Sequence, residues 1–216
     1  MRSIELNNKD EIRKFAQQKD IPHLLHFTHI SNLESILKWG LVSREKVDED
    51  YKGAVVNDMD RLDHRIDTIS LSIAHPNDKM FYKYRDNDAD WCVLGIKTSV
   101  LWEQDCLFFK HNAADGLVSG KADAELRDVS AFHSMYEEFG WIASREEQCL
   151  KNCDPTDVQA EVLVKKHIPA DSIFGVVVAN RQVKKNISSF TGDVQVVIND
   201  PNKVLYANRT YRRKWQ

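Results

Sequence analysis

The sequence predicts an α+β fold, and three observations lead to this class. Short apolar runs that are typical of strands recur along most of the chain. Segments with helical spacing are set between groups of these runs and do not alternate with them one by one. Glycine-rich phosphate loops of the GxGxxG or GxxxxGK type are absent from the sequence. A Rossmann-type site for a nucleotide is therefore excluded.

The positions of the elements follow from apolar periodicity and from turn residues. Strands are expected at residues 24–28, 68–74, 91–97, 106–109, 160–165, 173–178 and 194–198. Helices are expected at residues 129–138 and 181–188. A further helix follows the capping-box pattern Ser31-x-x-Glu34, and Gly40 is expected to end it in the left-handed conformation. Residues 43–67 carry many charges and little periodicity, so a long loop, mobile or ordered by a ligand, is expected there.

The composition limits the class of protein. A chain of 216 residues with 42% hydrophobic residues is expected to form one domain, residues 1–216. The sequence has neither a long apolar stretch nor an apolar leader, which predicts a cytoplasmic protein without a membrane anchor. Four scattered cysteines indicate reduced thiols, and the spacing of Cys149 and Cys153 alone does not support a zinc site, so no metal is expected.

A local basic segment stands out because the net charge of the whole chain is −3. Residues 208–215 interleave cations with aromatic side chains, among them Arg212, Arg213 and Trp215. This mixture pairs with phosphates and offers surfaces on which bases stack. The pattern predicts contact with nucleic acid, and an ordinary solvated tail is the alternative.

Glu161 is the candidate catalytic residue, and the motifs that precede it in the sequence support this role more than its own position does. It begins the apolar run Glu161-Val162-Leu163-Val164, where a single carboxylate could equally face solvent from an amphipathic strand. His26-Phe27-Thr28 lies on an earlier strand and Ser70-Leu71-Ser72 on the next. A histidine, a serine and a glutamate on three strands occur here in the order that ADP-ribosyltransferases use.

The fuller pattern resembles the DarT family of DNA ADP-ribosyltransferase toxins. The opening segment at residues 25–33, the Gln159-Ala160-Glu161 strand and the aromatic-basic ending at residues 211–215 are similar to the motifs of that family. The resemblance covers residues 23–215. Residues 69–80 depart from the Tyr-rich strand and Pro-x-Ser-Pro-Met segment of the best-known branch. The resemblance therefore implies the NAD chemistry of the family but not the base preference of that branch. The resemblance implies a single domain with a split mixed β-sheet and flanking helices.

The resemblance also implies NAD⁺ as co-substrate and assigns roles. Cleavage of the bond between nicotinamide and ribose builds positive charge on the sugar, as in glycoside hydrolysis. Glu161 would hydrogen-bond the ribose 2′-hydroxyl, stabilise that charge and help to deprotonate the attacking base. His26 would bind the adenosine-side ribose, the backbone of Phe27 the nicotinamide amide, and Thr28 would support the turn. A buried structural histidine is the alternative for His26, and a metal site built from His26 and His29 is not expected.

Further candidates lie in the loops. A loop arginine is expected to reach the phosphates or the target base, with Arg61 preferred over Arg44 and Arg65. Ser70 and Asn77 are expected to contact NAD⁺, with Asn112 as a weaker candidate. The residues expected to bind nucleic acid are Arg65, Arg212, Arg213 and Trp215, and Tyr136 and Trp141 are available for stacking unless they are buried.

The expected acceptor is a base of single-stranded DNA, since a base nitrogen must be unpaired to be reached. The resemblance implies a bacterial toxin or anti-phage effector, monomeric, and paired with an antitoxin such as a DarG-like macrodomain hydrolase. Two alternatives stay open on the sequence. One is the same chemistry on RNA or protein, and the other is an inactive nucleic-acid-binding module that keeps the fold.

Overall fold

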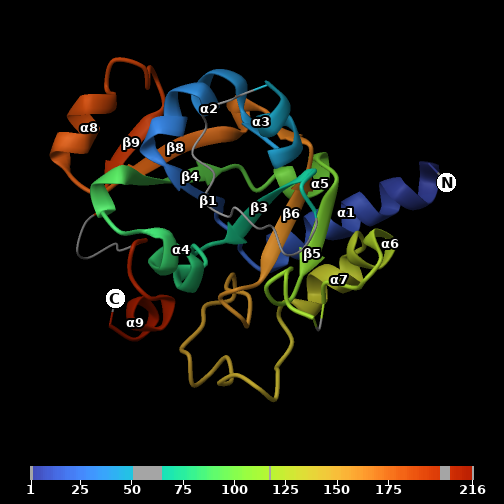
Figure 1. Cartoon of the computed structure of the whole chain (residues 1–216). Coiled ribbons are helices and arrows are strands. Elements are labelled where there is room, and N and C mark those ends of the chain that lie inside the picture. Colours follow the sequence, from blue (N-terminus) through green and yellow to red (C-terminus); the bar gives the residue numbers. More distant parts are fainter. Residues whose placement is uncertain (1, 51–64, 117, 200–204, 216) are drawn as a thin grey trace.

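The computed structural model describes residues 2–50, 65–116, 118–199 and 205–215 (Figure 1). A central β-sheet carries the candidate site residues, and helices surround it. The sheet is mixed but mostly antiparallel, because only the pairing of its last two strands is parallel. The expected α+β class is confirmed.

Seven strands form the main sheet, and a short pair lies apart from it. In spatial order the main sheet runs β5 (Cys106–Phe109), β6 (Glu161–Lys165), β3 (Thr68–Ile73), β1 (Leu24–His29), β4 (Trp91–Ile96), β8 (Ile173–Val178) and β9 (Gln195–Ile198). The short pair consists of β2 (Leu41–Val42) and β7 (His167–Ile168). Strands β4 and β5 are buried along their whole length, which explains their continuous apolar sequences.

The pairing of β1 is unequal on its two sides. It pairs with β4 at six positions, from Leu24↔Ile96 to His29↔Trp91. It pairs with β3 at only two positions, Leu24↔Ile73 and Leu25↔Ser72. Beyond Leu25 the backbone ladder between β1 and β3 stops, so the sheet is divided there into two paired groups of strands. Side chains from both groups meet at this division.

The α-helices among the described residues differ in length and in the face that they cover. Six of them are α1 (Arg2–Gln18), α2 (Leu33–Trp39), α4 (Asp78–Tyr84), α7 (Val129–Ser134), α8 (Arg181–Ile187) and α9 (Arg209–Trp215). The others are α3 (Arg44–Asp50), α5 (Val100–Glu103), α6 (Asp123–Leu126) and the 3-10 helices η1 (Ile30–Asn32), η2 (Asp88–Asp90) and η3 (Ala170–Ser172). Helix α1 packs on α5 and α7, whereas α9 lies on the other side of the molecule, near α4 (Figure 1).

The main hydrophobic core draws on residues from Ile12 to Ile187 and includes both paired groups of strands. A second cluster lies under α4, where Phe27 stacks on Phe81 with ring centroids 4.8 Å apart. A third lies over the outer strands β5 and β6 and includes Phe109 and Leu163. No helix in the described ranges is both long enough and apolar enough to cross a membrane.

All of the expected strands are present, with ends that differ by at most one residue from the prediction. Helix α8 begins as expected, and α7 is shorter than predicted because it ends at Ser134. The backbone of Gly40 has a φ of 85°, as expected, and its N–H donates to the Ile36 carbonyl, which ends α2. With a ψ of −178°, Gly40 lies in a region of positive φ that is open mainly to glycine and differs from the left-handed helical region.

Two expectations are wrong. Ser31 does not cap α2: it lies inside η1, and its backbone N–H and hydroxyl group both contact His29 Nδ1. The loop expected at residues 43–67 is interrupted by α3, which begins at Arg44. Polar helices of this kind lack the apolar stripe on which the prediction relied.

Candidate active site

Glu161 is the first residue of β6 and is only 6% exposed. It faces Phe109 of β5 in the strand register. On the other side of β6 lies β3, where the hydroxyl group of Ser70 donates a 3.1 Å hydrogen bond to Glu161 Oε2. Ser70 is opposite Leu163 and therefore diagonal to Glu161 on the same face of the sheet. The serine thus fixes one carboxylate oxygen of the candidate catalytic residue.

His26 lies on β1 and approaches Ser70 of β3 across the division of the sheet. Its Nδ1 atom lies 2.9 Å from the carbonyl oxygen of Ser70. A carbonyl oxygen only accepts, so Nδ1 carries a proton and donates to it. Ser70 therefore connects His26 and Glu161, its carbonyl accepting from one and its hydroxyl donating to the other.

The neighbours of His26 on β1 have structural contacts. Thr28 is buried, and its hydroxyl oxygen accepts a 3.1 Å hydrogen bond from Asn32 Nδ2. This bond ties the end of β1 to the short helix that follows. Phe27 points to the opposite face, where it packs against Phe81 and Trp91.

Asn77 is brought to this region by a turn after β3. Ala74 adopts a positive φ of 58°, and three residues later the backbone N–H of Asn77 donates to Ser72 Oγ at 3.0 Å. The Asn77 side chain caps α4 by accepting from the Met80 N–H. Asn77 is 2% exposed, and its Nδ2 finds no acceptor within the described ranges. A buried donor of this kind calls for an acceptor that a ligand could supply.

These residues form one group at the division of the sheet. We call it the cleft cluster, and its members are His26, Thr28, Ser70, Asn77 and Glu161. The structure brings together the predicted residues from three separate strands, and Asn77 joins them through Ser72, which lies on the same strand as Ser70.

A histidine–aspartate pair near Glu161 was missed by the sequence analysis, which named only Asn112 from this segment. His111 Nδ1 lies 2.5 Å from Asp157 Oδ2, and the other oxygen of Asp157 accepts from the Gln159 backbone N–H. The pair joins the chain after β5 to the segment that enters β6. The weaker candidate Asn112 is engaged locally, since its Oδ1 accepts from the Ala114 N–H.

The candidate arginines differ in their surroundings. Arg65 contacts Asp123 and the Lys121 carbonyl oxygen, and its guanidinium lies over the Phe109 ring, 5.3 Å from the centroid. Phe109 is the strand partner of Glu161, so Arg65 lies near the cleft cluster. Arg44 is the first residue of α3. Arg61 lies outside the described residues.

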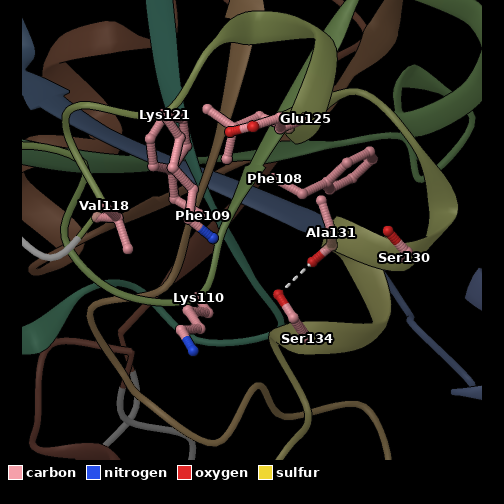
Figure 2. A pocket seen from close by; sticks show the side chains of 10 residues that line it. Phe108, Phe109, Lys110, Val118, Lys121, Glu125, Ser130, Ala131 and Ser134 are labelled. Atoms are coloured by element: carbon pink, nitrogen blue, oxygen red, sulfur yellow. Dashed lines mark hydrogen bonds between the residues drawn. The ribbon is translucent and has the colours of Figure 1, made fainter.

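A cavity of about 140 Å³ lies at the free edge of β5, between this strand and helices α6 and α7 (Figure 2). Phe108, Phe109, Val118 and Leu126 contribute apolar lining. Lys110 and Lys121 also line the cavity, and both are labelled in the close-up. Nothing in the sequence analysis predicted this cavity.

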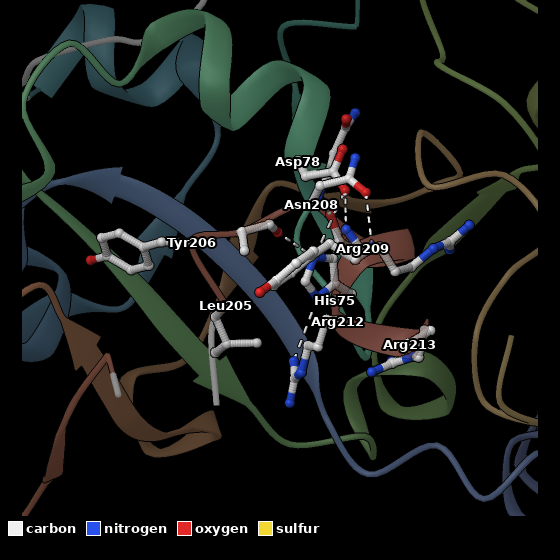
Figure 3. Close-up of polar contacts among 12 residues, drawn as sticks. His75, Asp78, Leu205, Tyr206, Asn208, Arg209, Arg212 and Arg213 are labelled. Atoms are coloured by element: carbon white, nitrogen blue, oxygen red, sulfur yellow. Dashed lines mark hydrogen bonds and ion pairs between the residues drawn. The ribbon is translucent and has the colours of Figure 1, made fainter. Parts of the chain in front are cut away.

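The basic ending of the chain forms α9, which docks through a second polar cluster (Figure 3). Arg209 is buried, its guanidinium donates to the carbonyl oxygens of Pro155 and Thr156, and its backbone N–H donates to Asp78. Burial lowers the pKa of Arg209 to about 10, against the opposing effect of the nearby carboxylates of Asp154 and Asp78. The group therefore remains charged at neutral pH.

Arg213 and His75 complete this cluster. Arg213 forms two 2.6 Å hydrogen bonds with the carboxylate of the fully buried Asp154. His75 Nε2 donates to the Ala207 carbonyl oxygen, and its Nδ1 accepts from Arg212. We call this group the C-terminal cluster, and its members are His75, Asp78, Asp154, Arg209, Arg212 and Arg213.

The candidates for nucleic-acid binding thus have different environments. Arg213 is committed to the ion pair with Asp154, whereas Arg212 is partly exposed and Trp215 is 74% exposed. Tyr136 is buried and donates to the Cys153 carbonyl oxygen, so it is a core residue and does not offer its ring for stacking. Trp141 is 54% exposed, so burial does not account for it. Among the described residues there is no group of His, Cys, Asp and Glu side chains suited to hold a metal ion.

Comparison with known structures gives the same fold. A Thermosipho africanus DarTG in complex with ADP-ribose superposes with a TM-score of 0.62 and 18% identity, covering 85% of this chain and 50% of that one. A Thermus sp. 2.9 DarT in complex with NAD⁺ gives a TM-score of 0.55 and 17% identity, covering 85% of this chain and 96% of that one. The same Thermus protein in complex with ADP-ribosylated ssDNA gives 0.52 and 18%, covering 87% and 97%.

At these identities the superpositions establish the fold, and this chain spans only half the length of the Thermosipho protein. No curated protein sequence matches the chain significantly. A family model does match: it is described as "ssDNA thymidine ADP-ribosyltransferase, DarT" and aligns with residues 25–206, most of the chain and all of the cleft cluster. The chain therefore belongs to the DarT family of ssDNA thymidine ADP-ribosyltransferases.

Proposed function

We propose that this protein transfers ADP-ribose from NAD⁺ to a thymidine base of single-stranded DNA. One observation carries the proposal. The serine at position 70 links an imidazole and a buried carboxylate at the place where β1 and β3 stop pairing. In this proposal residues 1–216 form one ADP-ribosyltransferase domain, and the divided mixed sheet is the split sheet that holds NAD⁺.

Glu161 has the central role in the chemistry. NAD⁺ supplies the ADP-ribosyl group, and nicotinamide leaves with the electron pair of the broken N-glycosidic bond. The ionised carboxylate stabilises the positive charge that develops on the ribose, and the free energy of this interaction grows as the bond breaks. The attacking base nitrogen loses a proton, for which Glu161 is the acceptor within the cleft cluster. The Ser70 hydroxyl holds Oε2 in place for both tasks.

The other residues of the cleft cluster would orient NAD⁺. His26 would hydrogen-bond the adenosine-side ribose, and the Ser70 carbonyl oxygen orients its ring. The Phe27 backbone would hold the nicotinamide amide, and Thr28 keeps the end of β1 in position through Asn32. Ser70 orients the carboxylate, and the Asn77 amide would donate to an oxygen of the dinucleotide. The donor and acceptor types therefore fit the polar groups of NAD⁺.

The DNA strand is expected to contact basic residues around this site. We assign Arg61 to the reacting phosphates or base, with Arg44 and Arg65 as alternatives. Arg65 lies over Phe109, beside Glu161, which supports a contact with the strand near the acceptor base. Arg212 and Trp215 would bind DNA from α9, and Arg213 would act there through its ion pair with Asp154.

The biological setting follows from the chemistry. ADP-ribose on a template base would block replication, so the enzyme would act as a bacterial toxin or anti-phage effector in the cytoplasm, as a monomer. A DarG-like macrodomain antitoxin that removes the mark would be its partner. Coexpression of this chain with such a hydrolase should restore growth that this chain alone arrests.

The test uses labelled NAD⁺ with separate pools of single-stranded DNA, duplex DNA, RNA and protein. We expect label on single-stranded DNA that contains thymidine, and none on the same oligonucleotide with every thymidine replaced. Glu161→Gln should lower the transfer rate about 100- to 10,000-fold, because the charge is lost while the shape is kept. Glu34→Gln, on the exposed surface of α2, is the matched control and should leave the rate unchanged.

Each alternative has a distinct outcome. Label on RNA or protein alone would retain the chemistry and contradict the acceptor. A folded wild-type protein that binds DNA but labels no pool would support the inactive binding module. Full activity in a folded Glu161→Gln variant would remove this residue from its central role.

A further inference from the structure

An exposed aromatic and cationic surface lies outside the cleft cluster. The rings of Phe139 and Trp141 stack with an interplanar angle of 9° and centroids 5.1 Å apart. Lys110 Nζ lies 5.1 Å from the Phe139 centroid and 5.7 Å from the Trp141 centroid. Phe139 is buried, but Trp141 remains half exposed. We call these three residues the Lys110–Trp141 surface.

This surface lies beside the candidate catalytic residue. Lys110 directly follows Phe109, which is the strand partner of Glu161. The segment that carries Trp141 leads on to β6, and the pair of His111 with Asp157 joins that segment to the chain immediately after Lys110. Lys110 is therefore one residue beyond the strand partner of Glu161, and the surface lies near the position where the acceptor base would react.

The cavity at the edge of β5 shares Lys110 with this surface (Figure 2). Its volume of about 140 Å³ is close to that of an apolar cavity of about 150 Å³ that holds one benzene ring in another protein. Two aromatic side chains line it together with Lys110, Lys121 and Glu125. In the parts of the chain that the structure describes, neither ammonium group forms a salt bridge with a carboxylate.

We propose that the Lys110–Trp141 surface, with the adjoining cavity, binds a nucleotide that flanks the acceptor base on the same single strand. This inference rests on the proposed function and adds a subsite to it. One base stacks on the exposed part of Trp141, and Lys110 pairs with the phosphate that follows. The cavity has the size for one six-membered ring of a neighbouring base.

Single-stranded nucleic acid fits this surface better than a protein partner does. Base stacking needs a flat aromatic face next to a cation, and the Phe139–Trp141 stack under Lys110 has this arrangement. Phe139 supports Trp141 from one side, which keeps the indole in a fixed orientation for stacking. Base stacking and a phosphate contact do not need the amide and hydroxyl groups with which a protein surface would bind a peptide backbone.

The chain contains a matched control for this surface. Trp39 is 53% exposed, and Lys38 Nζ lies 4.8 Å from its ring centroid. The pair is at the end of α2, whereas Trp141 lies in the segment between α7 and β6, at the opposite end of the molecule in Figure 1. Each pair joins a lysine to a half-exposed tryptophan, but among the described residues Trp39 has no stacked ring like Phe139, and it lies on another element than the strands around Glu161.

Binding is measured first, in the Glu161→Gln background, by fluorescence anisotropy of a labelled oligonucleotide, so that no turnover is needed. Trp141→Ala should weaken binding of a long oligonucleotide about 5-fold or more, and Trp141→Phe should restore most of the affinity. Lys110→Gln should weaken binding and lower the slope of log Kd against log salt by about one phosphate contact. Trp39→Ala and Lys38→Gln should change neither quantity.

Transfer kinetics in the wild-type background then locate the effect. With a long oligonucleotide, Trp141→Ala should raise KM for DNA by a similar factor and leave KM for NAD⁺ unchanged. With a short substrate that carries the thymidine but lacks its flanking nucleotides, the variant should differ less from wild type. Equal effects of Trp141→Ala and Trp39→Ala, or none from either, would overturn the subsite while transfer itself persists. Absence of both DNA binding and transfer in folded wild-type protein would instead reject the proposed function.

Discussion

The cleft cluster and the C-terminal cluster are both buried and polar, but different kinds of hydrogen bond hold them. In the C-terminal cluster, Arg213 meets the carboxylate of Asp154 in two short hydrogen bonds. In the cleft cluster, the carboxylate of Glu161 accepts from the neutral Ser70 hydroxyl. A charge that is matched by a fixed opposite charge stabilises one arrangement of the chain. The Ser70 hydroxyl holds the Glu161 carboxylate in one orientation through a directional hydrogen bond.

The two clusters also do different work in the fold. The C-terminal cluster fastens α9 to residues 154–156 and to the start of α4, segments far apart in the sequence. The cleft cluster lies where the pairing of β1 with β3 ends, so its hydrogen bonds add little to the ladder. We therefore expect substitutions in the first cluster to reduce stability and substitutions in the second to reduce activity.

The largest effect should come from breaking the buried ion pair. Asp154→Ala leaves the buried guanidinium of Arg213 without its counter-charge, and the free energy of unfolding should fall by about 3 to 5 kcal/mol. Urea unfolding monitored by tryptophan fluorescence measures this. KM for NAD⁺ of the protein that remains folded should be unchanged.

The control for this prediction removes both charges. The double variant Asp154→Leu with Arg213→Met should be less destabilised than the sum of the single variants, because no unpaired charge stays buried. Additive losses would show that Asp154 acts mainly through its bond with the Lys151 backbone N–H.

His75 should give the C-terminal cluster a pH dependence. Burial, followed by the charge of Arg212, lowers the pKa of His75 to about 3, and Arg209 and Arg213 act in the same direction. Its Nδ1 accepts from Arg212, so the ring is neutral and the 3.9 Å approach of Asp78 to Nε2 is not an ion pair. The carbonyl oxygen of Ala207 opposes the shift.

The sign of the effect follows from this lowered pKa. Between about pH 6.5 and 3 the unfolded chain binds a proton at this histidine and the folded chain does not, so stability falls as the pH falls through this window. The full loss is on the order of 5 kcal/mol. His75→Gln should flatten the dependence of the unfolding free energy on pH over this window, and an unchanged slope would show that other groups cause it.

The sequence predicted the sheet well because most of its central strands are buried and apolar. Residues 106–109 and 173–178 were predicted to the residue, since an apolar run without polar interruption has few alternatives in a small domain. Helix α9 was foreseen only as a basic-aromatic segment, because its docking depends on Arg209 entering a site made by residues 148–156. Long-range partners of a single arginine leave no periodic signal.

The candidate site shows the same limit. His26, Ser70 and Glu161 were predicted from motifs in order along the chain, and the structure connects them. The pair of His111 with Asp157 was missed, since the two residues are 46 positions apart and neither belongs to a motif. The sequence could not show that the β1–β3 ladder ends after two pairs.

The smallest expected effect concerns Asn77, which connects the two clusters. Its backbone N–H bonds to Ser72 on β3, and the next residue, Asp78, belongs to the C-terminal cluster. Asn77→Ser keeps a side chain that caps α4 and removes the buried Nδ2 group, so the free energy of unfolding should change by only a few tenths of a kcal/mol.

If Nδ2 donates to NAD⁺, Asn77→Ser should raise KM for NAD⁺ about 2- to 10-fold, the range expected for one hydrogen bond. Asn77→Ala, which also loses the cap, should lower the free energy of unfolding by about 1 kcal/mol. Initial-rate kinetics at varied NAD⁺, with thermal melts of both variants, separate the two roles. An unchanged KM in the serine variant would place Asn77 with the residues that hold α4 and α9, and the cleft cluster would then end at Ser70.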